Sequence, residues 1–392
     1  MFADNPVTTL GLAHHRYGDK PFGIRLADRQ LHAFLIGQTG TGKSTLLYNV
    51  ARQDAAADRG FCLIDPHGDL AASLHAELPE GTHRYWNVAD PESHVGYNPL
   101  TRVSADFRPL VASGLIDTLK KQWSDAWGVR MEHLLRYAIL ALLEQPRTDL
   151  RDIIRLFVDQ SFRQGVTASI TDEQVRAFWT KEYPAMNYKT AVDGVAPIAN
   201  KIGAFLAHPL VRRAVCDPAE PLRFRQMMDE GHSLIIDLAK GRLGTDVANV
   251  LGGLLMTSIM NAAFSRHDLP ETERRPFMLL VDEVSSFSTL TFASMLSEAR
   301  KYALSVTASQ QYLNRADHEV FEAIIGNVGS LLAFRVGAID APIIAKQLGV
   351  ATPADLVNLP NYRIMVRLMV DGQQTPPFTA DTFPSQRAGS PS

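Results

Sequence analysis

The chain has 392 residues, of which 46% are hydrophobic and 21% charged, and its formal net charge is −3. This composition is typical of a water-soluble globular protein of two or three domains. The two cysteines exclude a disulfide framework. Because acidic residues slightly outnumber basic ones, the chain has no overall positive field, and any contact with a nucleic acid must come from a local group of basic side chains.

No segment has the pattern of a signal peptide or a membrane anchor. The first twenty residues lack a basic segment followed by an apolar core. The longest uncharged run, residues 247–265, is interrupted by Asn249, Thr257, Ser258 and Asn261, so we expect a buried helix and not a membrane span. We therefore expect a cytoplasmic protein that reaches a membrane only through a partner.

The first part of the chain alternates between strand and helix patterns. Residues 1–30 predict a short lead-in with room for one strand at 22–26. Apolar residues 31–36 then lead into a glycine-rich turn and a helix that begins after Lys43. Two more strands are predicted at 60–64, which ends in Asp65-Pro-His-Gly-Asp69, and at 82–88.

The pattern changes between residues 103 and 225, where helical periodicity continues without a convincing strand. This segment holds 17 Lys and Arg against 14 Asp and Glu, a local net charge of about +3, and we expect it to be an all-helical insertion domain. Strands resume at 232–238, 276–283, 304–309, 331–336 and 363–370. We therefore predict an α/β core, formed by 31–102 and 226–372, with a parallel central sheet flanked by helices. The Pro-, Ser- and Thr-rich residues 373–392 predict a disordered tail.

Residues 37–44 read Gly-Gln-Thr-Gly-Thr-Gly-Lys-Ser and satisfy the phosphate-loop pattern in full, with a strand before and a helix after. Such a loop wraps backbone N–H groups around phosphates at a helix N-terminus. Lys43 would bridge the β- and γ-phosphates, and Ser44 would bind Mg²⁺. The sequence therefore predicts a P-loop NTPase with ATP and Mg²⁺ as cofactors. The predicted nucleotide-binding residues of the loop are Gly37, Gln38, Thr39, Gly40, Thr41, Gly42, Lys43, Ser44 and Thr45.

A pair of carboxylates follows the apolar run that begins at residue 276. Asp282 would hold the Mg²⁺ through water, and Glu283 would polarise the attacking water. Two consecutive acids favour an ATPase motor with an additional strand over a GTPase, which typically lacks the second acid.

Two further groups follow along the chain. If the strand at 304–309 lies between the phosphate-loop strand and the acidic strand, Gln310 can sense the γ-phosphate, with Gln311 as the alternative. Arg300 ends the preceding helix, and it either complements that helix C-terminus or acts as an arginine finger in a neighbouring subunit.

Taken together, these residues resemble the HerA/FtsK superfamily of ring-forming, RecA-like ATPases, and most closely its TraG/TraD-type coupling proteins of conjugation and type IV secretion. The likeness covers about 30–372. It includes Gln30-Leu-His32 before the loop, Ile64-Asp65-Pro-His-Gly-Asp69 and Asn98-Pro-Leu100 before the helical insertion. It also includes the acidic motif Val281-Asp-Glu-Val-Ser-Ser-Phe287, and the segment Glu298-Ala-Arg-Lys301 followed by Gln310 and Gln311. The last matching positions are Asn327, Phe334-Arg335 and Asp340. Full-length coupling proteins carry N-terminal transmembrane helices and HerA proteins carry an N-terminal β-barrel, and this sequence predicts neither.

The resemblance implies a homo-oligomer, most simply a hexamer, that moves DNA through its channel. It also implies that Asp65 supports catalysis, although a residue at this strand end could equally be only a loop cap. For Arg335 the resemblance implies a second contact to the nucleotide of a neighbouring subunit. The first expected function is DNA transfer with type IV secretion or relaxosome partners. The alternatives are a translocase with a nuclease partner, in DNA end processing or phage defence, and an assembly ATPase that energises protein secretion.

Overall fold

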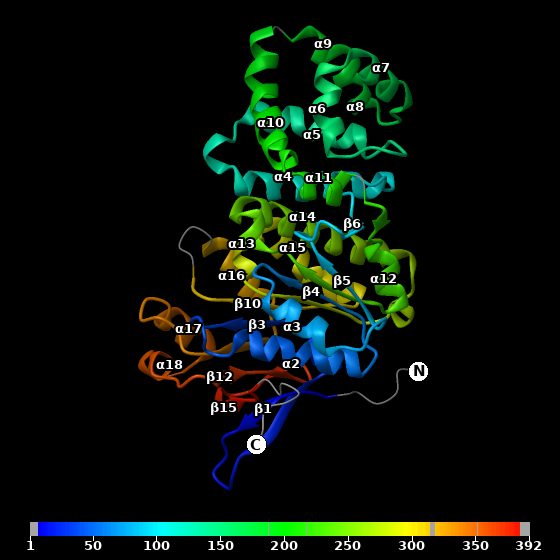
Figure 1. Cartoon of the computed structure of the whole chain (residues 1–392). Helices are drawn as coiled ribbons and strands as arrows, with labels where there is room; N and C mark the ends of the chain where they lie inside the picture. The colour runs from blue at the N-terminus through cyan, green and yellow to red at the C-terminus, as the bar shows by residue number, and fades with distance from the viewer. Residues whose placement is uncertain (1–6, 187, 217, 314–317, 351, 385–392) are drawn as a thin grey trace. The chain divides into compact units, whose positions relative to one another are not determined.

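The computed structural model describes residues 7–186, 188–216, 218–313, 318–350 and 352–384. Its main feature is an eleven-stranded sheet with the order β2-β1-β15-β12-β11-β3-β10-β9-β4-β8-β5 (Figure 1). The strands of this sheet are β1 (Val7–Ala13), β2 (Lys20–Arg25), β3 (Ala33–Ile36), β4 (Phe61–Asp65), β5 (His83–Asn87), β8 (Ser233–Asp237), β9 (Phe277–Val281), β10 (Leu304–Gln310), β11 (Ser330–Ala333), β12 (Arg363–Arg367) and β15 (Phe378–Thr382). Two short ribbons pair β6 (Val95–Gly96) with β7 (Glu220–Pro221) and β13 (Met369–Val370) with β14 (Gln373–Gln374).

The centre of the sheet is parallel, as the sequence predicted. Strands β11, β3, β10, β9, β4 and β8 pair in parallel register. Strand β10 lies between β3 and β9, so an additional strand separates the phosphate-loop strand from the acidic strand. Because all these strands point the same way, the residues at their carboxyl ends meet along one edge of the sheet.

Helices cover both faces of the sheet. Leu35 packs in the same core cluster as Leu47 of α2 (Lys43–Ala56) and Leu74 of α3 (Asp69–Glu77), which cover one face. Phe34 points to the opposite face, where its ring meets Phe321 of α16 (His318–Asn327). The other helices in the sheet-forming part of the chain are α1 (Leu26–Arg29), α12 (Phe224–Glu230), α15 (Leu290–Ala299), α17 (Ala341–Leu348) and α18 (Ala354–Val357), with 3₁₀ turns at Ser265–Asp268, Glu271–Glu273, Val284–Ser286 and Arg300–Tyr302.

The two ends of the chain differ from the prediction. Residues 1–30 are more than a lead-in, because they include β1, β2 and α1, and the expected tail contributes β15 at 378–382. Strand β15 lies between β1 and β12 and pairs antiparallel with both. Gly11 permits this pairing, since a Cβ there would lie 2.1 Å from the Asp381 carbonyl oxygen. The last part of the expected tail, 385–392, lies outside the described residues.

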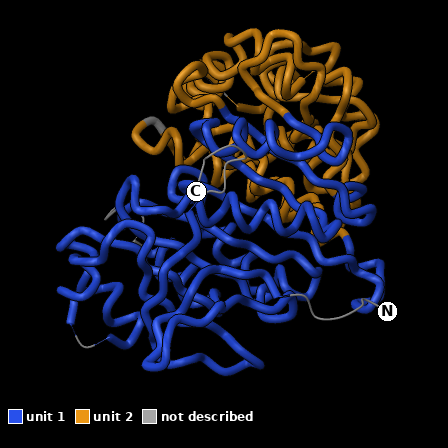
Figure 2. The backbone as a smooth tube through the Cα atoms, turned by 60° about the horizontal axis from the view of Figure 1, so that its bottom comes forward, with its two compact units in different colours: residues 1–85, 225–238, 266–392 blue, residues 86–224, 239–265 orange. Residues whose placement is uncertain are grey.

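The chain divides into two compact units (Figure 2). Unit 1 holds residues 1–85, 225–238 and 266–392, and unit 2 holds 86–224 and 239–265. Unit 2 is mainly helical, and its strand residues are the end of β5 and the two-residue strands β6 and β7. Its helices are α4 (Arg108–Gln122), α5 (Val129–Leu142), α6 (Leu150–Val158), α7 (Gln160–Ser169), α8 (Glu173–Ala177), α9 (Tyr183–Ala185), α10 (Tyr188–Ala207), α11 (Pro209–Cys216), α13 (Lys240–Leu243) and α14 (Thr245–Phe264), with 3₁₀ turns at Ala105–Phe107 and Ser124–Ala126 and a π-helical turn at Phe178–Glu182.

Unit 2 is larger than the predicted insertion because α14 packs against α4. Small residues bring these two helices close: a Cβ on Gly114 would lie 2.4 Å from the Thr257 methyl, and one on Gly253 would lie 2.5 Å from the Thr118 methyl. Among the described residues, one helical segment, Thr245–Asp268, is long and apolar enough to cross a membrane, and 72% of its most apolar stretch is buried inside the protein.

Candidate nucleotide site

The loop between β3 and α2 has the geometry of an anion cradle. Gly40 has a φ of 75° and Gly42 a φ of 116°, which is the left-handed region that favours glycine. The loop is anchored by its own backbone, because the Gly37 N–H donates to the Gln310 carbonyl (3.2 Å) and the Gln38 N–H to the Arg335 carbonyl (2.8 Å). The loop leads directly into α2, whose first N–H groups have no acceptor within the helix, and a helix N-terminus favours a bound anion.

Lys43 lies inside the loop. Its side chain is 6% exposed, and its Nζ donates to the carbonyls of Gly37 (2.6 Å) and Gln38 (3.0 Å). Burial lowers the pKa of Lys43, while the nearby carboxylates of Asp282 and Glu283 raise it. The ammonium group thus occupies the position from which a lysine reaches phosphate oxygens.

Ser44 and Asp282 meet across the sheet edge. The Ser44 hydroxyl donates to Asp282 Oδ2 at 2.9 Å, and the hydroxyl of Ser309, on the intervening strand β10, donates to Asp282 Oδ1. A hydroxyl and a carboxylate are hard oxygen ligands of the kind that Mg²⁺ prefers. The two side chains that the sequence predicted as metal ligands therefore lie together and fit a magnesium ion.

Glu283 lies beside this pair with a strained backbone. Its φ is 50°, which is uncommon outside glycine. One carboxylate oxygen lies 3.1 Å from His67 Nε2, and the other accepts a hydrogen bond from the Gln311 amide. The side-chain amide oxygen of Gln311, Oε1, in turn accepts a hydrogen bond from the Thr39 hydroxyl at 3.0 Å. Glu283 is therefore held between the loop after β4 and the phosphate loop.

The two glutamines at the end of β10, Gln310 as its last residue and Gln311 directly after it, make different contacts. Gln310 is 4% exposed, and its amide donates to the Tyr312 carbonyl at 2.7 Å. Gln311, which the sequence offered as the alternative sensor, is the residue that links the phosphate loop with Glu283.

Asp65 shapes the loop after β4. Its carboxylate accepts from the N–H groups of His67 and Ala71, both at 2.9 Å. Burial raises the pKa of Asp65, and these backbone donors lower it. These contacts make Asp65 a cap of the loop and of α3, and they fix the position of His67 beside Glu283.

The two predicted arginines lie at different edges. Arg335 follows β11 at the phosphate-loop edge and binds within its own chain, with Nε 3.3 Å from Gln38 Oε1 and Nη2 2.9 Å from Asn361 Oδ1. Arg300 is exposed just before β10, at the opposite edge of the sheet. Its backbone carbonyl accepts from the Ala303 N–H at 2.9 Å, but among the described residues its side chain makes no hydrogen bond or ion pair.

Four residues at the phosphate-loop edge have positions that the sequence did not single out: His67, Asp237, Ser309 and Tyr362. His67 lay inside the recognised motif 65–69, and Ser309 directly precedes Gln310. Asp237 ends β8 and is 5% exposed, with its carboxylate packed against Gly68. Tyr362 had no motif to mark it.

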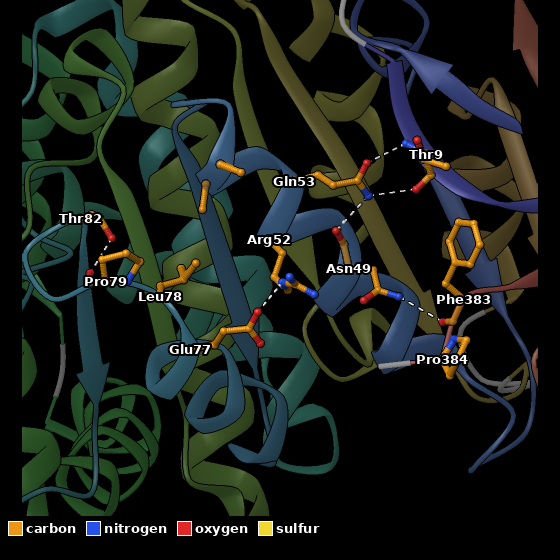
Figure 3. A pocket seen from close by; sticks show the side chains of 12 residues that line it. Thr9, Asn49, Arg52, Gln53, Glu77, Leu78, Pro79, Thr82, Phe383 and Pro384 are labelled. Atoms are coloured by element: carbon orange, nitrogen blue, oxygen red, sulfur yellow. Dashed lines mark hydrogen bonds and ion pairs between the residues drawn. The ribbon is translucent and has the colours of Figure 1, made fainter. Parts of the chain in front are cut away.

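A separate groove of about 540 Å³ lies beside the C-terminal half of α2 (Figure 3). Arg52 and Glu77 form an ion pair at 2.5 Å on one side, and Asn49 and Gln53 bind the backbone of Phe383 and Thr9 on the other. The phosphate loop lies at the other end of α2, so this groove is not part of the nucleotide site.

The topology and the edge residues define a P-loop NTPase fold of the class with an additional strand between the phosphate-loop strand and the acidic strand. No protein-family model matches the sequence, and the comparison with curated proteins finds no relative. Solved structures do match over nearly the whole chain.

These structures include the conjugative coupling protein TrwB and VirB4. TrwB in complex with ADP and Mg²⁺ has 17% identity and a TM-score of 0.66, covering 99% of this chain and 98% of that one. TrwB in complex with the ATP analogue ADPNP has 20% identity and a TM-score of 0.66, covering 92% and 86%. VirB4 of Thermoanaerobacter pseudethanolicus has 15% identity and a TM-score of 0.68, covering 98% of each chain. The resemblance to coupling proteins is thus confirmed at the level of the fold.

Proposed function

We propose that this chain is an ATP-hydrolysing ring motor that translocates DNA, as in conjugative or type IV secretion DNA transfer. The observation that carries the proposal is the contact of Ser44 with Asp282, with Glu283 beside it on the far side of β10. The likeness in fold to a conjugative coupling protein that binds ADP and Mg²⁺ supports it.

In the proposed mechanism the loop backbone and Lys43 bind the β- and γ-phosphates of ATP. Ser44 and Asp282 hold Mg²⁺, which when bound neutralises the charge that develops on the phosphates. The Glu283 carboxylate accepts a hydrogen bond from the attacking water and takes its proton. Because Ser44 and Asp282 already touch, the two ligands need little rearrangement to hold the metal ion.

Gln311 and His67 position Glu283 in this scheme. Gln311 bridges Thr39 and Glu283, so it is the better placed of the two glutamines to couple the γ-phosphate to the base. Asp65 acts indirectly, since its carboxylate holds the loop that carries His67.

The motor is proposed to be a homo-oligomer, most simply a hexamer. Arg300 lies at the opposite sheet edge from its own phosphate loop, so a role in hydrolysis requires the nucleotide of a neighbouring subunit. There it would stabilise transition-state charge. Arg335, in contrast, contacts Gln38 of its own loop, which favours a role within the subunit.

The experiment that tests the proposal is ATP hydrolysis by the purified chain with and without single- and double-stranded DNA, with the mass measured by light scattering. We expect DNA-stimulated hydrolysis in a ring-sized oligomer. Lys43→Ala and Glu283→Gln should lower kcat by about 10²- to 10⁴-fold. Glu298→Gln changes an exposed glutamate paired with Lys301 and should leave kcat unchanged.

The outcomes separate the candidate functions. Hydrolysis that is indifferent to DNA would favour an assembly ATPase for protein secretion. DNA-stimulated hydrolysis together with a nuclease that co-purifies would favour DNA end processing or defence. Hydrolysis that survives Glu283→Gln would contradict the proposed mechanism itself.

A further inference from the structure

The residues described so far account for the phosphates of a bound nucleotide but not for its ribose and base. Ser44, Asp282 and Glu283 mark the side of the loop that faces β10 and β9, where the γ-phosphate and the metal ion belong. The ribose and base must therefore leave the loop on its other side, toward β11 and β12. Strand β12 runs antiparallel to β11, so the residue before β12 lies at the same edge as the phosphate loop. That residue is Tyr362.

Tyr362 is attached to the phosphate loop. Its N–H donates to the Thr41 carbonyl at 2.8 Å. Its ring lies against Gly42 so closely that a Cβ on Gly42 would be 2.8 Å from Cδ1 of the ring. The tyrosine is nevertheless 40% exposed, so part of the ring remains accessible next to the start of α2.

The backbone of Tyr362 is held in an unfavourable conformation. Its φ is 64°, which for a bulky residue is a genuine outlier. The conformation persists because Thr382 of β15 donates to the Tyr362 carbonyl from both its N–H (2.7 Å) and its hydroxyl (3.0 Å), while Thr41 accepts from its N–H. A glycine or an asparagine would suit this backbone better, so strain maintained around an aromatic ring at the loop points to a function of the ring.

Arg335 holds the same segment against the loop. Its guanidinium donates to Gln38 Oε1 (3.3 Å), to the Leu359 carbonyl (3.2 Å) and to Asn361 Oδ1 (2.9 Å). The residues before Tyr362 are thus fixed to the first part of the phosphate loop, and the ring has a defined position on the nucleoside side.

We propose that Tyr362 is the stacking platform for the base of the bound nucleoside phosphate, with Arg335 as the residue that positions it. This inference rests on the proposed nucleotide site and names the part of the ligand that the loop itself does not recognise. Stacking uses the face of the base and not its edges, so adenine and guanine should both be accepted.

The test compares a nucleotide with a ligand that lacks the base. Affinities for ADP, GDP and pyrophosphate, each with Mg²⁺, are measured by calorimetry for the wild type and for Tyr362→Ala, Tyr362→Leu and Tyr362→Phe. Tyr362→Leu keeps apolar bulk against Gly42 but removes the aromatic face. Tyr17→Ala removes a tyrosine that is 81% exposed on the β1–β2 turn and serves as the matched control.

We expect Tyr362→Ala and Tyr362→Leu to weaken ADP and GDP binding about tenfold and to leave pyrophosphate binding within twofold. Tyr362→Phe and Tyr17→Ala should bind as the wild type does. The inference is overturned if Tyr362→Leu binds ADP as Tyr362→Phe does, or if ADP and pyrophosphate weaken by the same factor, because the ring then only supports the loop.

Failure of the proposed function looks different. If the wild type binds neither ADP nor pyrophosphate, or if Lys43→Ala binds ADP as well as the wild type does, the nucleotide site itself is wrong. Wild-type binding that requires Lys43 but ignores Tyr362 overturns the stacking platform alone.

Discussion

His32 connects three segments through a buried imidazole. It is 3% exposed and has a φ of 64°. Its Nδ1 accepts from the Val306 N–H at 3.1 Å, so its Nε2 carries the proton and donates to the Leu296 carbonyl at 3.0 Å. Burial, and to a smaller extent the charge of Arg300, lower the pKa of His32 from 6.5 to about 4, although the hydrogen bond to the Leu296 carbonyl acts in the opposite direction. The neutral form is therefore the one that the fold stabilises.

This shift predicts how stability depends on pH. Between pH 6.5 and about 4 the unfolded chain binds a proton at His32 that the folded chain does not, so stability is lost as the pH falls through this window. The full contribution is about 3 kcal/mol. We expect urea unfolding at pH 7 and pH 5 to show a smaller pH-dependent loss for His32→Gln than for the wild type. His15→Gln, at an exposed position, should retain the wild-type slope; equal slopes in all three proteins would contradict the prediction.

The candidate site could be predicted from the sequence where the motif is local. The loop at 37–44 and the pair 282–283 are contiguous, and the fold brings Ser44 to Asp282 as those motifs require. The choice between Gln310 and Gln311 could not be made, because consecutive residues at a strand end point to opposite sides and a shift of one residue exchanges them. Tyr362 could not be found at all, since no local motif marks it and only the folded sheet, in which β12 pairs with β11 and β15, brings it to the loop.

At the scale of single elements, the far end of α2 is fixed by a buried carboxylate. Asp54 is fully buried and binds Arg29 of α1 through two hydrogen bonds (2.6 and 2.8 Å) and Arg59 Nε at 2.8 Å. Arg29 is itself only 3% exposed. The N-terminal segment is thus tied to the helix that begins at the phosphate loop.

We expect Asp54→Ala to lower the free energy of unfolding by about 3–5 kcal/mol, because it leaves two guanidinium groups without their buried counter-charge. Asp58→Asn removes the charge of a carboxylate that is 97% exposed beside Arg275, keeps a residue that tolerates the φ of 50° there, and should change stability by less than about 0.5 kcal/mol. Urea unfolding followed by circular dichroism measures both. A loss of under about 1 kcal/mol in Asp54→Ala would mean that solvent reaches the arginines.

The elements of the core were predictable because β3, β4, β8 and β9 are largely apolar runs, while β10 alternates apolar residues with Ser and Thr and is buried along its whole length. The antiparallel strand β15, in contrast, could not be predicted from the sequence. Strand β15 contains Thr379, Asp381 and Thr382 and follows Pro376-Pro377, so its local sequence reads as a loop. It becomes a strand because β1 and β12, far away in the sequence, supply partners on both sides.

At the scale of the whole molecule, strand β10 separates Arg300 from the phosphate loop of the same chain, because the two lie at opposite ends of this strand. Arg300 lies before its first residue, and Gln310 is its last. Seven residues at about 3.3 Å each span roughly 20 Å. An Arg300 side chain cannot reach across this distance to the phosphate loop of its own chain, so a catalytic Arg300 implies that each complete site is shared by two subunits.

This argument predicts complementation between two inactive variants. Arg300→Ala alone should lower kcat about a thousandfold or more if the residue is an arginine finger, and Glu283→Gln alone should be similarly inactive. In rings assembled from equal amounts of both, about a quarter of the interfaces combine an intact Glu283 with an intact Arg300 of the neighbour, and hydrolysis should return to a corresponding fraction. Glu283→Gln mixed with Lys43→Ala is the matched control, because both changes damage the same side of the interface and no mixture restores a site. If the first mixture stays as inactive as the second, while light scattering shows that mixed rings form, Arg300 does not act across the interface and its exposed position at the end of α15 has a structural role only.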